Sequence, residues 1–508
     1  MTRDLWRDKK TEMVEEHSFQ RRLNLFDSTA IVVGSMIGSG IFIVSADIAR
    51  MVGSPGWLMM VWIITGFMTI FAALSYGELA GMFPKAGGQY VYLKEAYNPL
   101  TGFLYGWTLF LVIQTGTIAA VAMAFAKFFG VLIPWVSESV VWFSLNSIDF
   151  GPVDLGLFTI GHFNMGFVKF GPVQLVAIGS VAFLTWINTR GIQEGKKIQN
   201  VFTSGKFILL VLFIIIGLGF ASNHHSIHLN NLTFWNPERE GAGGVDIPLS
   251  GMALVAAIGM AMVGSLFSSD AWNNITFTAG EVINPRKNIP LSLALGTLAV
   301  TALYLLANLV YITVLPVRGD PAGTDIAARG IQYALNDRLG TAAISGVFGN
   351  YAVLIMASFI VISTFGCNNG LILSGARVYY AMASDGIFFK KVGNLNTKGV
   401  PATGLVIQGI WAGLLCLSGT YGQLLDYVVF AVLIFYVLTI FGVFLLRKKR
   451  PEMERPYKAF GYPVIPMVYI LLALAVMIIL LIYKPEYTWP GLIIVILGIP
   501  VFYLWNKK

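Results

Sequence analysis

A break rich in glycine and serine interrupts an apolar stretch near the start of the chain. Residues 34–42 read Gly-Ser-Met-Ile-Gly-Ser-Gly-Ile-Phe. A helix in hydrocarbon leaves no backbone polar group unpaired unless that group faces protein, water or a ligand, so we predict that the helix opens here. A second break, Gly-Ser-Leu-Phe-Ser-Ser-Asp-Ala-Trp, occupies residues 264–272. Paired interrupted helices, one in each half of a membrane chain, indicate a transporter binding site.

The composition is that of a polytopic membrane protein. The 508 residues are 56% hydrophobic and 12% charged, whereas soluble domains carry about 25% charged residues. We attribute the net charge of +8 to cytoplasmic Lys and Arg and expect no nucleic-acid partner. The charged first 22 residues lack the apolar core of a signal peptide. Cys367 and Cys416 both lie in apolar runs and do not indicate a disulfide framework.

Twelve stretches approach the roughly 20 apolar residues that a membrane span needs. They are residues 29–52, 57–82, 101–130, 173–189, 202–221, 249–280, 291–315, 343–383, 401–418, 423–446, 464–483 and 489–506. The eighth is too long for one crossing, and we expect it to begin as an external helix. With both termini in the cytoplasm, about 25 loop Lys and Arg face inward and about eight face outward. This bias predicts a multi-pass protein of the cell membrane, either plasma or inner.

The two breaks begin with related tripeptides, Val33-Gly34-Ser35 and Val263-Gly264-Ser265, in the first and sixth spans. This position suggests two inverted repeats of five helices. The predicted organisation has five segments: a cytoplasmic N-terminal segment, a first repeat, an external loop, a second repeat, and a basic loop with two accessory helices. They cover residues 1–22, 23–222, 223–248, 249–446 and 447–508.

Five groups of motifs follow one another at characteristic spacing. They lie at residues 37–42, 76–79 with 84–92, 198–206, 272–273 with 281–290, and 447–457. Together they resemble the amino acid–polyamine–organocation superfamily, and within it the L-type amino acid transporters. The resemblance runs from about residue 23 to the C-terminus. It implies an all-α membrane protein with a LeuT-like five-plus-five inverted repeat, unwound helices 1 and 6, two accessory helices, and alternating access.

An opened helix can hold both charged groups of an amino acid substrate. Free N–H groups at the start of a half-helix bind a carboxylate, and we expect Ser39, Gly40 and Ile41 to supply them. Free carbonyls near Met36 and Ile37 would accept from the ammonium group. Glycine suits a backbone that a ligand approaches closely. Close helix packing through the Gly34-x-x-x-Gly38 pattern is the alternative reading of this motif.

The second break supplies the other half of the expected site. Phe267 and Ser268 would offer further carbonyls, and Phe267 resembles the family's aromatic gate over the substrate. Asp270 departs from the family pattern, in which this turn is small and neutral. A carboxylate here is costly unless paired. It could pair with Lys206, attract a cationic substrate side chain, strengthen the hold on the ammonium, or cap the second half-helix. Asn274 also departs from the pattern, since relatives often carry an aromatic residue there.

Lys206 lies within the fifth span, and ionisable residues inside membranes are functional by default. In the resemblance it stands where sodium-coupled relatives bind a cation between spans one and eight. Its ammonium would then reach carbonyls near the first break and hydroxyls such as those of Ser363 and Thr364. This position implies sodium independence, and a lowered proton affinity would permit a proton-coupled cycle. The alternative is a lysine that snorkels to the cytoplasmic edge.

Other charged groups suggest weaker assignments. Glu78, Glu281 and Arg377 lie at the cytoplasmic side and would form a closing salt bridge, or interfacial charge without a gating role. We interpret the histidines at 224, 225 and 228 as solvated residues of an external loop and expect no metal site. No cofactor is expected.

Animal L-type transporters are linked to a glycoprotein through a cysteine after span three. Residues 131–172 contain no cysteine, so we expect no disulfide-linked ancillary subunit.

The favoured function is a sodium-independent exchanger of neutral L-amino acids. The alternatives within transport are a proton-coupled importer and a carrier of cationic amino acids or polyamines. A membrane sensor would be expected to carry a long cytoplasmic tail, and the chain ends close to its last span. An enzyme would need a catalytic dyad or metal cluster, and none is apparent on a shared face. A channel would favour a continuous polar lining over broken helices.

Overall fold

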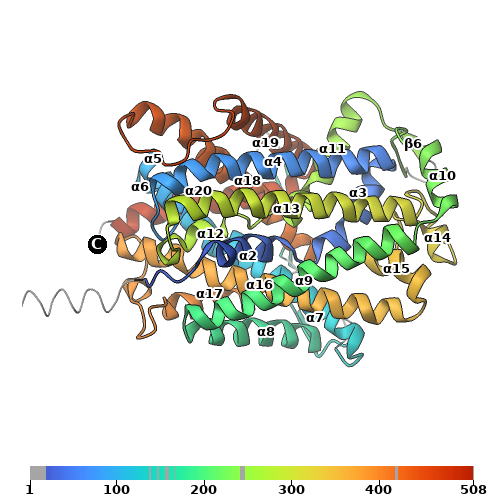
Figure 1. Cartoon of the computed structure of the whole chain (residues 1–508), viewed down its shortest axis with the longest axis horizontal. Coiled ribbons are helices and arrows are strands. Elements are labelled where there is room, and N and C mark those ends of the chain that lie inside the picture. The colour runs from blue at the N-terminus through green and yellow to red at the C-terminus, as the bar shows by residue number, and fades with distance from the viewer. Residues whose placement is uncertain are drawn as a thin grey trace, which may run out of the picture.

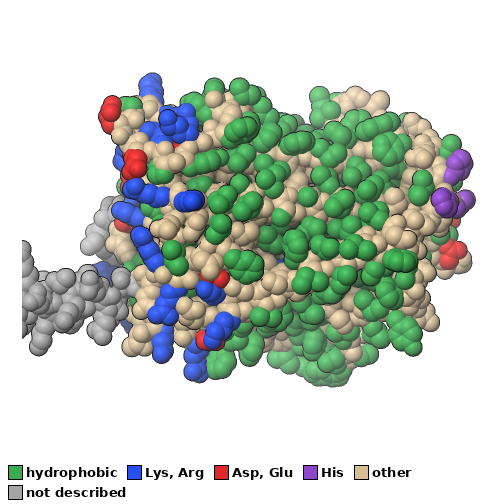
Figure 2. All heavy atoms as spheres, in the orientation of Figure 1, with side chains coloured by type: hydrophobic (Ala, Val, Ile, Leu, Met, Phe, Trp, Pro, Cys, Tyr) green, Lys and Arg blue, Asp and Glu red, His purple; other side chains and the backbone are tan. Residues whose placement is uncertain are grey.

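The molecule is a bundle of long helices that run roughly along one axis (Figure 1). Its computed structural model describes residues 19–136, 139–145, 148–154, 159–165, 168–240, 246–417 and 421–506. Within these residues, ten helices are long and apolar enough to cross a membrane. Hydrophobic side chains cover the middle of the visible face, and Lys and Arg gather at one end (Figure 2). This distribution is that of a multi-pass membrane protein.

The first half of the chain contains the following helices: α2 (Leu25–Met36), η1 (Gly40–Phe42), α3 (Val44–Val52), α4 (Pro55–Met82), α5 (Gln89–Ala96), α6 (Pro99–Thr108), η2 (Leu109–Ile113), α7 (Gln114–Leu132), α8 (Pro172–Thr189), α9 (Ile192–Phe220) and α10 (His224–Leu232). The element η2 is a π-helical turn that joins α6 to α7 in one long helix.

The second half contains the remaining helices: α11 (Gly251–Ser268), α12 (Asn274–Phe277), η3 (Ala279–Glu281), α13 (Pro285–Val314), α14 (Ile326–Arg329), η4 (Leu335–Asp337), α15 (Leu339–Phe348), α16 (Tyr351–Ser384), η5 (Lys390–Gly393), α17 (Ala402–Leu415), α18 (Tyr421–Lys449), α19 (Val464–Tyr483) and α20 (Pro485–Asn506).

Short antiparallel strand pairs lie in two of the polar stretches between the helices, a feature that the all-α expectation omitted. They are β1 (Phe143–Leu145) with β4 (Val168–Phe170), β2 (Ile148–Asp154) with β3 (Thr159–Met165), and β5 (Glu238–Glu240) with β6 (Asp246–Pro248). In the first pair Phe143 is opposite Phe170. The histidines at 224, 225 and 228 are exposed, as predicted, but they lie on helix α10 and not in an irregular loop.

The predicted long eighth stretch is two helices. Gly349, with φ +52°, separates α15 from α16, so the expected division into two helices is confirmed, and the external position of the first stays a prediction. The ninth stretch corresponds to α17, which has 14 residues and is shorter than the ten long helices. Its predicted end at residue 418 lies outside the described residues.

The interrupted segments lie inside the bundle because long helices enclose them. Helix α13 packs on α2, α4 and α9, and α16 packs on α2, α7 and α9. Small residues permit this close approach. A Cβ atom added at Gly296 would lie 2.4 Å from Cγ1 of Val32, and one added at Gly66 would lie 2.4 Å from Cγ2 of Thr301. Glycine is therefore required where α13 touches α2 and α4.

The start of α2 is fixed by its own side chains and by α9. Asn24 and Asp27 form a reciprocal capping box with two hydrogen bonds of 2.9 Å. Such a cap satisfies N–H groups that have no partner within the helix. Asp27 also accepts from Asn200 at 2.7 Å and pairs with Lys196 at 2.6 Å. The N-terminal half of the broken helix is thereby anchored on α9.

Gly296→Leu should destabilise the folded protein, because the new side chain would overlap Val32 and separate α13 from α2. We expect its melting temperature in detergent, measured by fluorescence-detected size exclusion, to fall by several degrees. Gly179→Leu is the matched control, since nothing lies within 4 Å of a Cβ atom at that exposed position. Equal melting temperatures for the two variants would contradict the close contact.

Candidate functional site

The first helix is interrupted at the glycine-rich motif, where the sequence predicted it. Helix α2 ends at Met36, and its C-cap Ile37 has an extended backbone with φ −75° and ψ 100°. The chain resumes as the short turn η1 at Gly40 and then as α3 at Val44. Residues 37–39 therefore lie outside regular helix while buried in the bundle.

The second interruption follows α11, which ends at Ser268. The backbone then turns through Ala271, which has a φ of +64° that residues other than glycine rarely adopt. The chain re-enters helix at α12, with Asn273 as its N-cap and no side-chain capping hydrogen bond. Asp270 therefore does not cap this half-helix, in contrast to one of the alternatives drawn from the sequence.

The two interruptions lie against each other, and α13 joins them. A Cβ atom added at Gly40 would lie 2.1 Å from Oγ of Ser268. The hydroxyl of Tyr304 is placed to donate to the carbonyl of Met36 at 3.0 Å and to that of Ser268 at 3.1 Å. Tyr311 donates to the carbonyl of Ile41 at 3.0 Å. The structure thus brings Met36, Gly40, Ile41 and Ser268 together.

Sequence reasoning missed Tyr304 and Tyr311. Their signal was a pair of hydroxyl-bearing rings seven residues apart in an apolar span, a spacing that places both on one helix face. That spacing alone does not distinguish a tyrosine that binds backbone carbonyls from one that packs in the core.

Lys206 of α9 is fully buried and reaches the first interruption. Its Nζ donates to the carbonyls of Gly34 at 2.5 Å, Ile37 at 2.7 Å and Ser363 at 3.3 Å. All three acceptors are backbone carbonyls, whereas the sequence suggested carbonyls near the first break together with the hydroxyls of Ser363 and Thr364. A side chain with 0% exposure does not snorkel to the membrane surface, so that alternative does not describe the structure.

Helix α16 completes the shell around the opened carbonyls. The Ser363 hydroxyl lies 3.0 Å from the carbonyl oxygen of Gly38 and 3.2 Å from that of Ile37. The thiol of Cys367 donates to the carbonyl of Ser35 at 3.0 Å. The hydroxyl of Thr364 instead bonds to Ile360 in its own helix, so Thr364 does not share this contact.

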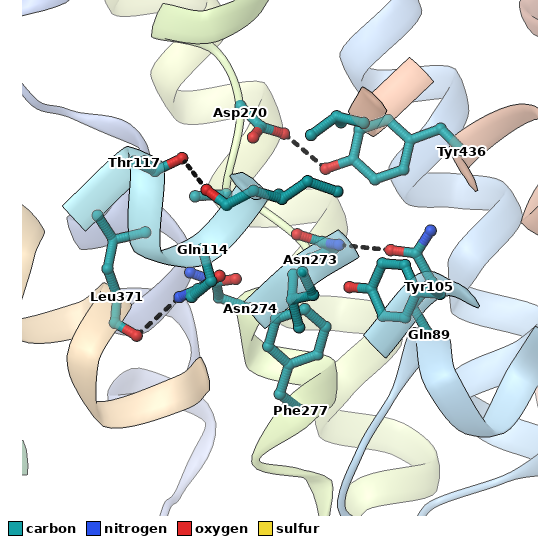
Figure 3. Close-up of a pocket in the computed structure, with 14 residues that line it drawn as sticks. Gln89, Tyr105, Gln114, Thr117, Asp270, Asn273, Asn274, Phe277, Leu371 and Tyr436 are labelled. Carbon is teal, nitrogen blue, oxygen red and sulfur yellow. Dashed lines mark hydrogen bonds between the residues drawn. The ribbon is translucent and has the colours of Figure 1, made fainter. Parts of the chain in front are cut away.

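Asp270 lies on the side of the second interruption that faces α18. Its Oδ1 accepts from the Tyr436 hydroxyl at 2.6 Å (Figure 3). Among the ion pairs of the described residues none joins Asp270 to Lys206, so this suggested pairing is absent there. Trp272 and Tyr76 pack edge to face, with ring centroids 4.8 Å apart, and both rings contact Tyr436. The carboxylate thus has a hydroxyl partner in an aromatic setting.

A small cavity of about 20 Å³ lies beside this carboxylate, between α5, α6, α7, α12, α16 and α18. Its volume is enough for about one water molecule. Most of its lining side chains are polar (Figure 3), and three of them are amides held by hydrogen bonds. Asn273 donates to Gln89 at 3.0 Å, and Gln114 donates to the carbonyl of Leu371 at 2.7 Å. Asn274 lines the same cavity.

The three charged residues expected at the cytoplasmic side form two separate groups. Arg377 and Glu281 make a bidentate pair at 2.9 and 3.0 Å, with both side chains only 1% exposed. Glu78 belongs to another cluster, where it accepts from Arg447 at 2.6 and 2.9 Å. The backbone amides of Arg22 and Leu23 donate to the carbonyl of Glu281, which places the N-terminal segment beside the first pair.

This arrangement suits binding more directly than covalent catalysis. Interrupted helices present backbone carbonyls and N–H groups inside the bundle, where they can accept from an ammonium group and donate to a carboxylate. Within the described residues, no group of three or more His, Cys, Asp or Glu side chains is placed to hold a metal ion.

Comparison with known proteins identifies the family of the chain. A family model described as amino acid permease matches residues 23–502. The b(0,+)-type amino acid transporter 1 of Mus musculus is 27% identical over 492 residues, which cover 96% of this chain and 88% of the relative. The large neutral amino acids transporter small subunit 2 of Homo sapiens is 27% identical over 499 residues, with 97% and 82% covered. The chain therefore belongs to the amino acid permease family.

Proposed function

We propose that this protein is a sodium-independent exchanger of neutral L-amino acids that works by alternating access. The observation that carries the proposal is the fully buried ammonium of Lys206 against the carbonyls of Gly34, Ile37 and Ser363. Membership of the amino acid permease family and the names of the relatives, which are amino acid transporters, support the substrate class.

The ammonium of Lys206 substitutes for a bound cation. Carbonyl oxygens from two helices converge on it, as they would on a sodium ion. A positive charge that is already supplied by the protein removes the need for a coupling ion between α2 and α16. Transport would then depend on amino acid gradients, because no ion gradient drives the cycle.

The substrate site is proposed at the two interruptions. The start of η1, with Ser39, Gly40 and Ile41, would bind the carboxylate group. The carbonyls of Met36 and Ile37 would accept from the ammonium group. Their proximity to the second interruption through Gly40 and Tyr304 supports a shared site.

The second interruption would contribute the remaining contacts. Phe267 would close over the substrate, Ser268 would contribute a carbonyl, and Asp270 would face the side chain of the substrate. Asp270 lines the cavity beside this interruption, which supports that placement.

The finer organisation of the fold is also a proposal. We infer twelve spans, with two inverted repeats at residues 23–222 and 249–446 and accessory helices in 447–508. The interruption of both α2–α3 and α11–α12 supports this repeat. Lys and Arg gather at the end of the molecule where the chain terminates (Figures 1 and 2), which supports cytoplasmic termini in a plasma or inner membrane.

We infer further that the protein works without a disulfide-linked ancillary subunit. Cys367 and Cys416 are both buried, and buried thiols are poorly placed to bond to a partner chain.

A proton-coupled importer is the second candidate, and Lys206 again motivates it. The ion pairs of the described residues give this buried ammonium no acidic partner. A buried lysine without a counter-charge is suited to releasing its proton during a cycle. The Glu281–Arg377 pair would close the cytoplasmic side in either mechanism.

Reconstituted protein should exchange amino acids without sodium. We expect labelled neutral amino acids to enter liposomes loaded with unlabelled neutral amino acids and not empty liposomes, because exchange requires an internal substrate. Uptake into empty liposomes driven by a pH gradient would favour the proton-coupled importer. An absolute requirement for sodium would contradict both candidates.

Lys206→Ala should reduce exchange at least tenfold while the protein stays folded, because the carbonyls at the first interruption lose their cation. Initial uptake rates, compared at equal amounts of monodisperse protein, would measure the loss. Lys287→Ala, at an exposed position at the start of α13, is the matched control and should transport normally. Unchanged flux in the Lys206 variant would overturn the tethered-cation mechanism.

Arg377→Met should leave the Glu281 carboxylate buried without its partner, at a cost of about 3–5 kcal/mol. We expect a clear fall in melting temperature and faster modification of an engineered cytoplasmic-side cysteine in the substrate path. Arg286→Met is the control, because its pair with Glu454 is 55% and 72% exposed and should contribute little. Equal stability of the two variants would argue that the buried pair does not hold this side closed.

A further inference from the structure

The cavity beside the second interruption contains two groups whose hydrogen-bonding capacity the fold does not use. Asp270 accepts from Tyr436 at 2.6 Å, while a carboxylate offers about four lone-pair sites. Asn274 is 1% exposed, and its Nδ2 has no hydrogen-bond partner. The two residues lie four positions apart and line the same cavity (Figure 3). One therefore presents an acceptor there and the other a donor.

A buried amide that lacks a partner is costly, as is a carboxylate in the membrane interior without a cation. The neighbouring amide side chains of Gln89, Asn273 and Gln114 all have hydrogen-bond partners within the protein. Among the polar side chains that line this cavity, the buried atom without a hydrogen-bond partner is Nδ2 of Asn274, and the Asp270 carboxylate has acceptor sites beyond its bond with Tyr436. A ligand that offers an acceptor to Asn274 and a donor to Asp270 would remove both costs.

The position of the cavity connects it to the proposed substrate site. Ser363 and Cys367 of α16 contact the first interruption, and Leu371, one helical turn beyond Cys367, lines the cavity. Asp270, which lines the cavity, follows Ser268 of the second interruption by two residues. A substrate whose backbone groups lie at the interruptions would thus direct its side chain toward Asp270 and Asn274.

We propose that this protein prefers neutral amino acids whose side chains carry both a donor and an acceptor, namely hydroxyl or carboxamide groups. The inference rests on the proposed transport function and specifies its substrate class. The side chains of serine, threonine, asparagine and glutamine satisfy Asp270 and Asn274 together. An aliphatic side chain bonds to neither residue, an ammonium group has no acceptor for Asn274, and a carboxylate repels Asp270.

A second cavity lies on the other side of Asp270 and Tyr436. It also measures about 20 Å³, and it meets Asp270 and Tyr436 from the side of α4 and α19. Asp270, Val432 and Tyr436 line both spaces. The lining on this far side is mainly apolar, with Met68, Ala72 and Leu266, and it suits methylene groups.

The test is a competition panel in liposomes that contain the whole protein. Serine, threonine, asparagine, glutamine, leucine, phenylalanine, lysine and glutamate would compete with labelled serine and, separately, with labelled leucine. We expect the four hydroxyl and carboxamide amino acids to compete at least tenfold more strongly than the others. Exchange that is strongest with leucine, phenylalanine or lysine would overturn this inference and leave the transport function standing. If no amino acid is exchanged, the transport function fails, and the inference fails with it.

Two variants locate the preference. Asn274→Leu removes the donor and Asp270→Gly removes the acceptor, so each should lower competition by serine and glutamine about tenfold relative to leucine. Asn274→Ser keeps a donor and should retain more of the preference than Asn274→Leu. Asn231→Leu, exposed on α10, is the matched control. An unchanged competition profile in both Asn274→Leu and Asp270→Gly would overturn the assignment.

A binding measurement tests the same preference in variants that have lost transport activity. Glutamine or serine should raise the melting temperature of the detergent-solubilised wild-type protein more than leucine does, because a ligand that binds the folded state stabilises it. This difference should disappear in Asn274→Leu and persist in Asn231→Leu. Equal shifts for all amino acids with the wild-type protein would count against the proposed preference.

Discussion

The opened backbone at residues 34–38 is the constraint to which the surrounding helices respond. Its carbonyl oxygens lie inside the bundle, where each unpaired polar group would cost several kcal/mol. The structure satisfies them with donors from three helices: Lys206 from α9, Ser363 and Cys367 from α16, and Tyr304 from α13. The interruption is thus a point at which separate parts of the chain are held together.

These donors come from three helices that are separate in the sequence, α9, α13 and α16. Hydrogen bonds to an opened helix can exchange without unfolding a regular element, because no helical ladder has to break first. At the second interruption the carboxylate of Asp270 accepts from Tyr436, and Nδ2 of Asn274 has no hydrogen-bond partner. The carbonyls of the first interruption therefore have protein donors, which a substrate ammonium would join or replace, whereas the second has a buried donor without an acceptor.

The charged side chains inside the molecule fall into two kinds, those in ion pairs and those without an opposite charge. Arg377 and Glu281 are both buried, whereas buried Glu78 pairs with Arg447, whose side chain is 25% exposed. Lys206 and Asp270 lie inside without opposite charges among the ion pairs of the described residues, and they depend on backbone carbonyls and a tyrosine hydroxyl. Groups of this second kind are the ones whose protonation or ligand contacts can change during transport.

The sequence by itself determined the membrane class, most of the spans and the positions of both interruptions. Length and hydropathy suffice for the spans, because each helix must satisfy its own backbone in hydrocarbon. Glycine and serine at residues 34–40 and 264–269 marked where that rule is relaxed. Lys206 was recognisable for a related reason, since an ion within an apolar span requires partners.

Only the tertiary structure decided which partners these groups take. Sequence could not show that Glu78 bonds to Arg447 while Arg377 bonds to Glu281, or that Asp270 faces Tyr436 and not Lys206. It also could not identify Tyr304 as the link between the two interruptions. These contacts join residues up to several hundred positions apart, and their geometry depends on how the helices pack and rotate. The local pattern of glycine and serine determines where the helix backbone opens. The packing of the helices determines which side chains contact the opened backbone.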